Sequence, residues 1–146
     1  MYSYWPCQFE ITDKEAAWER SIEGMKEVAE AAESLGIECC QEVLNRYETY
    51  IITDCREGLE YCRRVGSENV NLLLDTFHMN IEEDNIPEAI RLAGRKLGHL
   101  HVGESNRKLP GMGSLPWRDI GRALRDIGYE KGVVMEPSRR RGRSGL

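Results

Sequence analysis

Apolar positions along the chain alternate between a helical period and short continuous runs. Between residues 12 and 35, apolar residues recur every three or four positions, which predicts an amphipathic helix. Thr12 and Glu15 form a capping box at the start of this stretch, and Gly36 follows its end. The expected buried stripe of this helix consists of Ile22, Met25, Val28, Ala29, Ala32 and Leu35.

Further helices and strands are expected in strict alternation after this first helix. The helical stretches cover about residues 54–65, 86–97 and 117–127, and Pro87 stands in the first turn of the second of them. Continuous apolar runs, typical of strands in a parallel sheet, lie at residues 37–44, 70–74, 98–102 and 132–135, and residues 2–5 are expected to end an earlier strand.

This alternation predicts an α/β protein with a parallel sheet and right-handed crossovers. A (β/α)8 barrel layout is the favoured interpretation, and an open doubly wound sheet is the alternative. No GxGxxG or Walker motif follows any expected strand, so the sequence lends no support to a nucleotide-binding fold or to an organic cofactor.

Length and charge narrow the class of protein. The chain has 146 residues, whereas a closed eight-stranded barrel uses roughly 250. Its net charge of −5 argues against a nucleic-acid binder, which needs a basic surface to neutralise phosphates. No apolar run approaches the roughly 20 residues that span a bilayer, and no signal peptide is visible, so we expect a cytoplasmic protein without membrane contact.

Cysteine usage and the last residues add two expectations. The five cysteines are an odd number and form no CxxC pair, so we expect reduced thiols rather than a disulfide framework or a zinc cluster. Residues 138–146 are rich in Arg, Gly and Ser without periodicity, which predicts a basic, disordered tail after a barrel domain at residues 1–137.

A potential metal ligand lies at the end of each of the four expected strands. These residues are Glu42, Asp75, His101 and Glu136, each about one βα repeat from the next. Successive parallel strands end at the same face, so the four side chains can converge there. Three carboxylates and one imidazole favour Mn²⁺, Mg²⁺ or Co²⁺ over a sulfur-rich zinc site.

Other polar residues follow the same strand ends. His78 could reach a substrate, Arg107 could bind an oxygen through a charge-assisted hydrogen bond, and Glu48 suits either the rim or the surface. His99 is expected to be a packed, hydrogen-bonded core residue.

Aromatic residues offer candidates for an apolar wall. Tyr4, Trp5 and Phe77 could line one side of a sugar pocket, whereas Trp117 is expected to pack in the core.

Four segments resemble the D-tagatose and D-psicose (D-allulose) 3-epimerase family within the xylose isomerase-like barrels. They are residues 42–48, 74–84, 98–107 and 133–137. The most specific are Asp-Thr-Phe-His-Met-Asn at 75–80 and Gly-Glu-Ser-Asn-Arg-Lys at 103–108. The resemblance implies a partial barrel, from the end of the third strand to the seventh, and hence a fragment of the family's full barrel.

The resemblance also implies an activity. Glu42, Asp75, His101 and Glu136 would hold Mn²⁺ or Co²⁺, and Glu42 and Glu136 would also remove and return the proton at C3 of a ketose through an enediolate. By the same resemblance Glu48, His78 and Arg107 would contact the substrate, and the full-length enzyme would be a homo-oligomer.

Two other interpretations stay open at this point. The chain could be an inactive barrel fragment that associates through its edges. It could also be a related enzyme, such as a hydroxypyruvate isomerase or an endonuclease IV-like phosphodiesterase. The acidic net charge and the single-metal ligand set argue against the nuclease.

Overall fold

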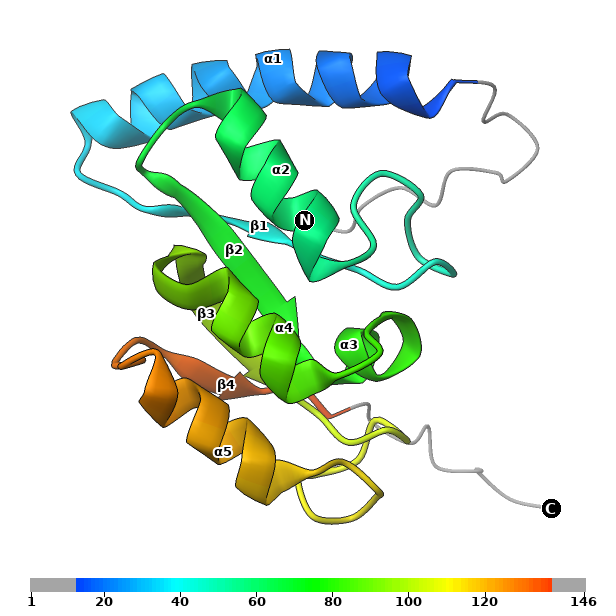
Figure 1. The fold of residues 1–146 in the computed structure, drawn as a ribbon. Coiled ribbons are helices and arrows are strands. Elements are labelled where there is room, and N and C mark those ends of the chain that lie inside the picture. Colours follow the sequence, from blue (N-terminus) through cyan, green and yellow to red (C-terminus); the bar gives the residue numbers. More distant parts are fainter. Residues whose placement is uncertain (1–12, 138–146) are drawn as a thin grey trace, which may run out of the picture.

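A computed structural model describes residues 13–137 of the chain (Figure 1). Helices and strands alternate, with one additional short helix after the second strand and a 3-10 turn before the third. In chain order the elements are α1 (Lys14–Ser34), β1 (Cys39–Glu42), α2 (Cys55–Val65), β2 (Val70–Asp75), α3 (Thr76–Glu82), α4 (Ile86–Ala93), η2 (Gly94–Lys96), β3 (Leu97–Val102), α5 (Trp117–Asp126) and β4 (Val133–Met135).

The four strands form one parallel sheet in the order β1-β2-β3-β4. Helices α2, α4 and α5 lie on the same side of this sheet, and α1 packs beside α2 (Figure 1). A doubly wound sheet reverses its strand order and carries helices on both faces. The sequential order and the one-sided helix layer instead match successive βα units of a barrel, so the doubly wound alternative is wrong.

The core lies between the sheet and the helix layer. In β2, Val70, Leu72 and Leu74 have no exposed surface and alternate with residues of the opposite face. Tyr61 of α2 and Ile90 of α4 are equally buried from the helix side. Successive side chains of a strand point to opposite faces, so Asp75 lies on the other face of the sheet, away from this core.

Side-chain caps begin four of the helices, in each case by accepting a backbone N–H of the first turn, and the cap of α3 is Asp75. Asp54 accepts from Glu57 at 2.8 Å, and Asn85 accepts from Glu88 at 3.1 Å. Asp13 caps α1 by accepting from Ala16 at 3.1 Å. The cap of α1 is therefore Asp13, and the expectation that Thr12 fills this role is wrong.

The expected buried stripe of α1 is only partly correct. Ile22, Ala29 and Ala32 are buried, but Val28 is 53% exposed and Leu35 is 72% exposed. The helix contacts the described chain mainly along α2, where the Trp18 and Tyr61 rings meet edge to face at 5.7 Å. This single narrow contact cannot cover a broad stripe, so its two outlying members stay in solvent.

The expected helix over residues 86–97 ends early. α4 stops at Ala93, Gly94 adopts a positive φ of 51°, and Leu97 already belongs to β3. A glycine in this backbone region ends a helix readily because it has no Cβ. The apolar side chain of Leu97 continued the helical pattern in the sequence, yet it is buried as the first residue of a strand.

The short helix α3 (Thr76–Glu82) follows β2 directly, and the periodicity of the sequence did not predict it. Cys39, Cys40, Cys55 and Cys62 are free thiols, as expected. The expected strand end at residues 2–5, with Tyr4 and Trp5, the thiol Cys7 and the tail at residues 138–146 lie outside the described residues. Among helices of the described part, none is long and apolar enough to cross a membrane.

Candidate metal centre

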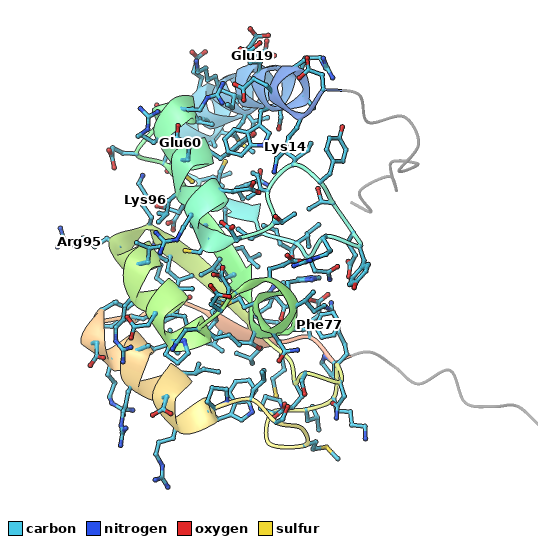
Figure 2. All side chains as sticks on the ribbon, turned by 45° about the vertical axis from the view of Figure 1, so that its right-hand side comes forward. Lys14, Glu19, Glu60, Phe77, Arg95 and Lys96 are labelled. Atoms are coloured by element: carbon cyan, nitrogen blue, oxygen red, sulfur yellow. The ribbon has the colours of Figure 1, made fainter. Side chains whose placement is uncertain are left out.

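The four predicted ligands meet at the carboxyl end of the sheet. Glu42 ends β1, Asp75 ends β2, His101 precedes the last residue of β3, and Glu136 directly follows β4. One ligand atom from each of them lies within 4.8 Å of the others. Figure 2 places Phe77 at this end of the molecule and Arg95 and Lys96 at the opposite end.

Asp75 belongs to both a strand and a helix, and this sets the roles of its two oxygens. It ends β2 and caps α3, with Oδ1 accepting the N–H of Phe77 at 2.9 Å. Its Oδ2 is buried and is the one buried side-chain polar atom among residues 13–137 without a hydrogen-bond partner. A buried oxygen without a hydrogen bond is costly. The Arg107 guanidinium lies 3.4 Å away and forms an ion pair with this oxygen but no hydrogen bond, so the position fits a bound cation.

His101 lies between the two outer carboxylates. Its Nδ1 is 3.2 Å from Glu136 Oε2 and 3.9 Å from Glu42 Oε1. Burial raises the pKa of Glu42, and the negative charges of Glu136 and Asp75 add to this effect, while His101 and Arg107 oppose it. A cation would relieve this concentration of like charge, so the donor set fits a divalent, oxygen-preferring metal ion.

Arg107 reaches the same centre from the loop after β3. Its backbone has a positive φ of 58°, and its guanidinium lies 4.4 Å from the centre of the Phe77 ring. Nη1 is 3.4 Å from Asp75 Oδ2, and Nη2 is 3.2 Å from Glu136 Oε2. The structure therefore brings together Arg107, Phe77 and two of the candidate ligands.

His78 and Glu48 lie beside the ligands rather than among them. His78 is buried in α3, with Nε2 3.7 Å from Asp75 Oδ2 and Nδ1 3.9 Å from Glu48 Oε1. Burial lowers the pKa of His78, although the charges of Asp75 and Glu48 act in the opposite direction. Both residues thus border the ligand cluster on its β1–β2 side.

The expectation for His99 needs correction. His99 is half-buried rather than in the core, and its ring meets that of His101 edge to face at 5.2 Å. Residues two apart on a strand share a face, and this face carries the ligands instead of the helix layer. Trp117 packs against the hydrophobic core, as expected, and its half-buried indole N–H donates to the Glu104 carboxylate.

Glu104 was not singled out by the sequence pattern, yet it organises the loop that carries Arg107. It has no exposed surface and accepts hydrogen bonds from the Trp117 indole and from the backbone N–H groups of Ser105, Gly111 and Leu115. Two signals were available, its position after a strand and its place in the Gly-Glu-Ser-Asn-Arg-Lys segment at 103–108. Neither assigns a role to the carboxylate, because a charge near a strand end is common on any loop. Burial acts to raise the pKa of Glu104, but these hydrogen bonds together lower it.

Asn45 is a second residue that the pattern did not identify. It is 1% exposed and contacts both Glu48 and His78. An asparagine after a strand usually reads as a turn residue. Its contact with His78 depends on how the loop after β1 packs against α3, which the sequence pattern does not show.

Comparison with known proteins agrees with this architecture. The model of the xylose isomerase-like TIM barrel family matches residues 3–145. A D-psicose 3-epimerase of Ruminiclostridium cellulolyticum is 56% identical over 143 residues, which are 97% of this chain and 49% of that protein.

Solved structures show the same relation. The crystal structure of D-psicose 3-epimerase with D-tagatose from Clostridium cellulolyticum H10 superposes with a TM-score of 0.91 at 56% identity, covering 97% of this chain and 49% of that one. A crystal structure of D-psicose 3-epimerase in the presence of D-fructose gives a TM-score of 0.90 at 49% identity, with the same coverage. The chain thus spans about half the length of the relatives it matches. With four sequential parallel strands and a match over nearly all its residues, this chain belongs to the xylose isomerase-like TIM barrel family and forms part of such a barrel.

Proposed function

We propose that this chain carries the metal-binding and acid–base part of a ketose 3-epimerase. The observation that carries the proposal is the order of the candidate ligands across the sheet. Glu42 comes from β1 and Glu136 follows β4, while Asp75 and His101 stand on the two strands between them. The two glutamates therefore belong to the two outer strands and flank the other two ligands, and inversion of one carbon requires an acid–base group on each of its faces.

The chemistry of the proposed reaction needs both carboxylates. Epimerisation at C3 removes a proton from a carbon next to a carbonyl and returns a proton to the opposite face. One of the pair Glu42 and Glu136 takes the proton, and the other protonates the resulting enediolate. With the other epimer as substrate the two residues exchange roles.

Without a cation, burial and then the neighbouring carboxylates raise the pKa of Glu42. A bound cation would oppose this shift and favour the ionised carboxylate that a general base needs. Glu42, Asp75, His101 and Glu136 would hold the metal ion, which supplies Lewis-acid polarisation of the ketose carbonyl when bound.

We assign the substrate contacts to the residues that lie beside the metal ligands. Arg107 and His78 offer N–H donors to the oxygens around the first carbons of the ketose, and Glu48 offers an acceptor. The Phe77 ring beneath the Arg107 guanidinium gives the same region an apolar surface. The complexes of similar enzymes with D-tagatose and D-fructose support a ketose as the substrate class.

Two measurements on one variant test the proposal. Mn²⁺ should raise the melting temperature of the protein, because a ligand that binds only the folded state stabilises it. In D₂O with Mn²⁺, D-fructose should exchange the hydrogen at C3 for deuterium, as seen by NMR. Glu136→Gln should remove most of the melting shift and at least 90% of the exchange.

Glu130→Gln is the matched control, because Glu130 is an exposed glutamate before the same strand. It should behave as the unchanged protein does. An equal Mn²⁺ shift in Glu136→Gln would refute the ligand assignment. The epimerase activity would be refuted if the protein binds Mn²⁺ but D-fructose shows no exchange at C3, or shows exchange at C1 in place of C3.

A further inference from the structure

Asn45 occupies a buried position between the loop after β1 and helix α3. The chain ties these two segments together next to it through Arg46 and Glu82. The Arg46 backbone N–H donates to Glu82 Oε1 at 2.6 Å. The Arg46 side chain donates to the same carboxylate through Nε at 2.9 Å and Nη2 at 2.8 Å. This paired hydrogen bonding fixes the distance between the Asn45 loop and the helix that carries His78.

The orientation of the Asn45 amide follows from two partners with a single possible role each. The N–H of Tyr47 can only donate, and it lies 2.9 Å from Asn45 Oδ1. The Glu48 carboxylate can only accept, and its Oε1 lies 2.9 Å from Asn45 Nδ2. Exchanging the amide oxygen and nitrogen would break both bonds, so Nδ2 is the atom that faces α3.

The same amide group determines which nitrogen of His78 carries the proton. Asn45 Nδ2 lies 2.7 Å from His78 Nδ1, and the Asn45 backbone N–H lies 3.3 Å from that same nitrogen. Two donors meet at Nδ1, so Nδ1 must accept. In a neutral imidazole the hydrogen is then on Nε2, because the hydrogen bond at one ring nitrogen sets the state of the other.

The Nε2–H bond faces the candidate metal centre. Nε2 is 3.4 Å from Arg107 Nη1 and 3.7 Å from Asp75 Oδ2. An arginine guanidinium only donates, so the Arg107 contact at Nε2 competes with the two donors at Nδ1, but the 2.7 Å contact of the Asn45 amide is the shorter one. With the hydrogen on Nε2, His78 and Arg107 are two donors side by side, and Asp75 Oδ2 marks the place where an oxygen faces both of them. We propose that Asn45 is a positioning residue that holds His78 as the Nε2–H tautomer, so that His78 presents a hydrogen-bond donor to an oxygen of the ketose. The identity of that ligand rests on the proposed function, whereas the tautomer does not.

Histidine ¹⁵N NMR tests the tautomer directly. The chain has three histidines, so ¹⁵N-histidine labelling gives few signals, and those of His78 are assigned by their loss in His78→Gln. Long-range ¹H–¹⁵N correlations, recorded with EDTA at a pH where imidazoles are neutral, should show Nδ1 without and Nε2 with a proton. A proton on Nδ1 in the unchanged protein would overturn the proposal without any variant.

Asn45→Asp tests the role of the amide. The carboxylate cannot donate to Nδ1, so we expect Nδ1 of His78 to become protonated. The control is Asn106→Asp on the loop after β3, whose amide donates to the Met112 carbonyl and not to a histidine. It should leave the His78 signals unchanged. A folded Asn45→Asp protein whose His78 Nδ1 stays unprotonated would overturn the proposal.

The ligand part has a separate readout. Adding D-fructose to the metal-loaded diamagnetic protein, with Mg²⁺, should shift the Nε2–H resonance, and the shift should be lost in Asn45→Asp. An unaffected resonance would overturn the donor role of His78. The expected tautomer without C3 exchange would refute only the proposed function, and C3 exchange with the opposite tautomer would refute only the role of Asn45.

Discussion

At the scale of single residues, buried polar side chains set the geometry around the candidate metal centre. Glu104 shows the physical balance best, because four N–H donors compensate the burial of its carboxylate. An ionised carboxylate without exposed surface is otherwise very costly. The hydrogen bonds therefore make Glu104 both a stabilising group and the anchor of the loop that carries Arg107.

Glu104→Gln should lower the free energy of unfolding by about 2 kcal/mol, since donors that lose a charged acceptor are left poorly paired. The pKa of Glu104 is lowered on folding, so its contribution is present above the unfolded-state pKa of about 4.3 and is lost as pH falls through the folded value. Urea unfolding at a series of pH values should show the two proteins farthest apart near pH 7 and converging below about pH 4.

The control for this prediction is Glu68→Gln, because the Glu68 side chain is fully exposed beside Lys96. A surface ion pair of this kind contributes at most about 1 kcal/mol, and often nothing measurable. The free energies of unfolding of Glu104→Gln and of the unchanged protein could instead differ by the same amount at every pH. That result would contradict the assigned role of the carboxylate.

At the scale of elements, the approach of helix to sheet decides where side chains fit. α2 lies so close to the sheet at Gly58 that a Cβ there would stand 3.0 Å from side-chain carbons of both Leu72 and Val43. In α1, a Cβ at Gly24 would meet nothing within 4 Å. Both glycines are helical, so helix propensity treats them alike and only packing separates them.

Two matched alanine substitutions measure this difference. Gly24→Ala should stabilise the protein by about 0.5–1 kcal/mol, the usual gain of alanine over glycine within a helix. Gly58→Ala should fail to show that gain and should be at least about 1 kcal/mol less stable than Gly24→Ala, because added volume in a packed core costs free energy. Chemical denaturation compares them, and equal gains would show that α2 can move away from the sheet.

At the scale of the whole molecule, the sheet edge at β4 is open within the described residues. All three residues of this strand are exposed, with 51% for Val133, 47% for Val134 and 61% for Met135. β4 pairs with β3 on one side alone in residues 13–137. Unpaired strands with apolar side chains are sites of association between chains.

The chain should therefore associate as its concentration rises, in a sedimentation velocity series from low to high micromolar concentration. Val133→Lys should reduce this association, because a charge on an edge strand opposes edge-to-edge pairing. Val28→Lys, an equal change at an exposed valine of α1, should leave it unchanged. A single monomeric species of the unchanged protein at every concentration would contradict the prediction.

The sequence by itself determined the alternation of helices and strands, the parallel sheet and the strand-end positions of Glu42, Asp75, His101 and Glu136. These features are local, because the period of 2 or 3.6 and the strand ends can be recognised within a few neighbouring residues. Local patterns also misplace two elements: the helical pattern runs past Gly94 into β3, and the short helix α3 has too few turns to show a period.

Only the tertiary structure decided how the polar residues between those strand ends are used. Asn45 meets His78 across 33 positions of sequence, and the donors that surround Glu104 include residues up to 13 positions away. A hydrogen bond depends on distance and angle in space, and an asparagine or glutamate looks the same in sequence whether it is buried or solvated. The one-sided helix layer, which makes the sheet part of a barrel, is likewise a property of how the βα units pack.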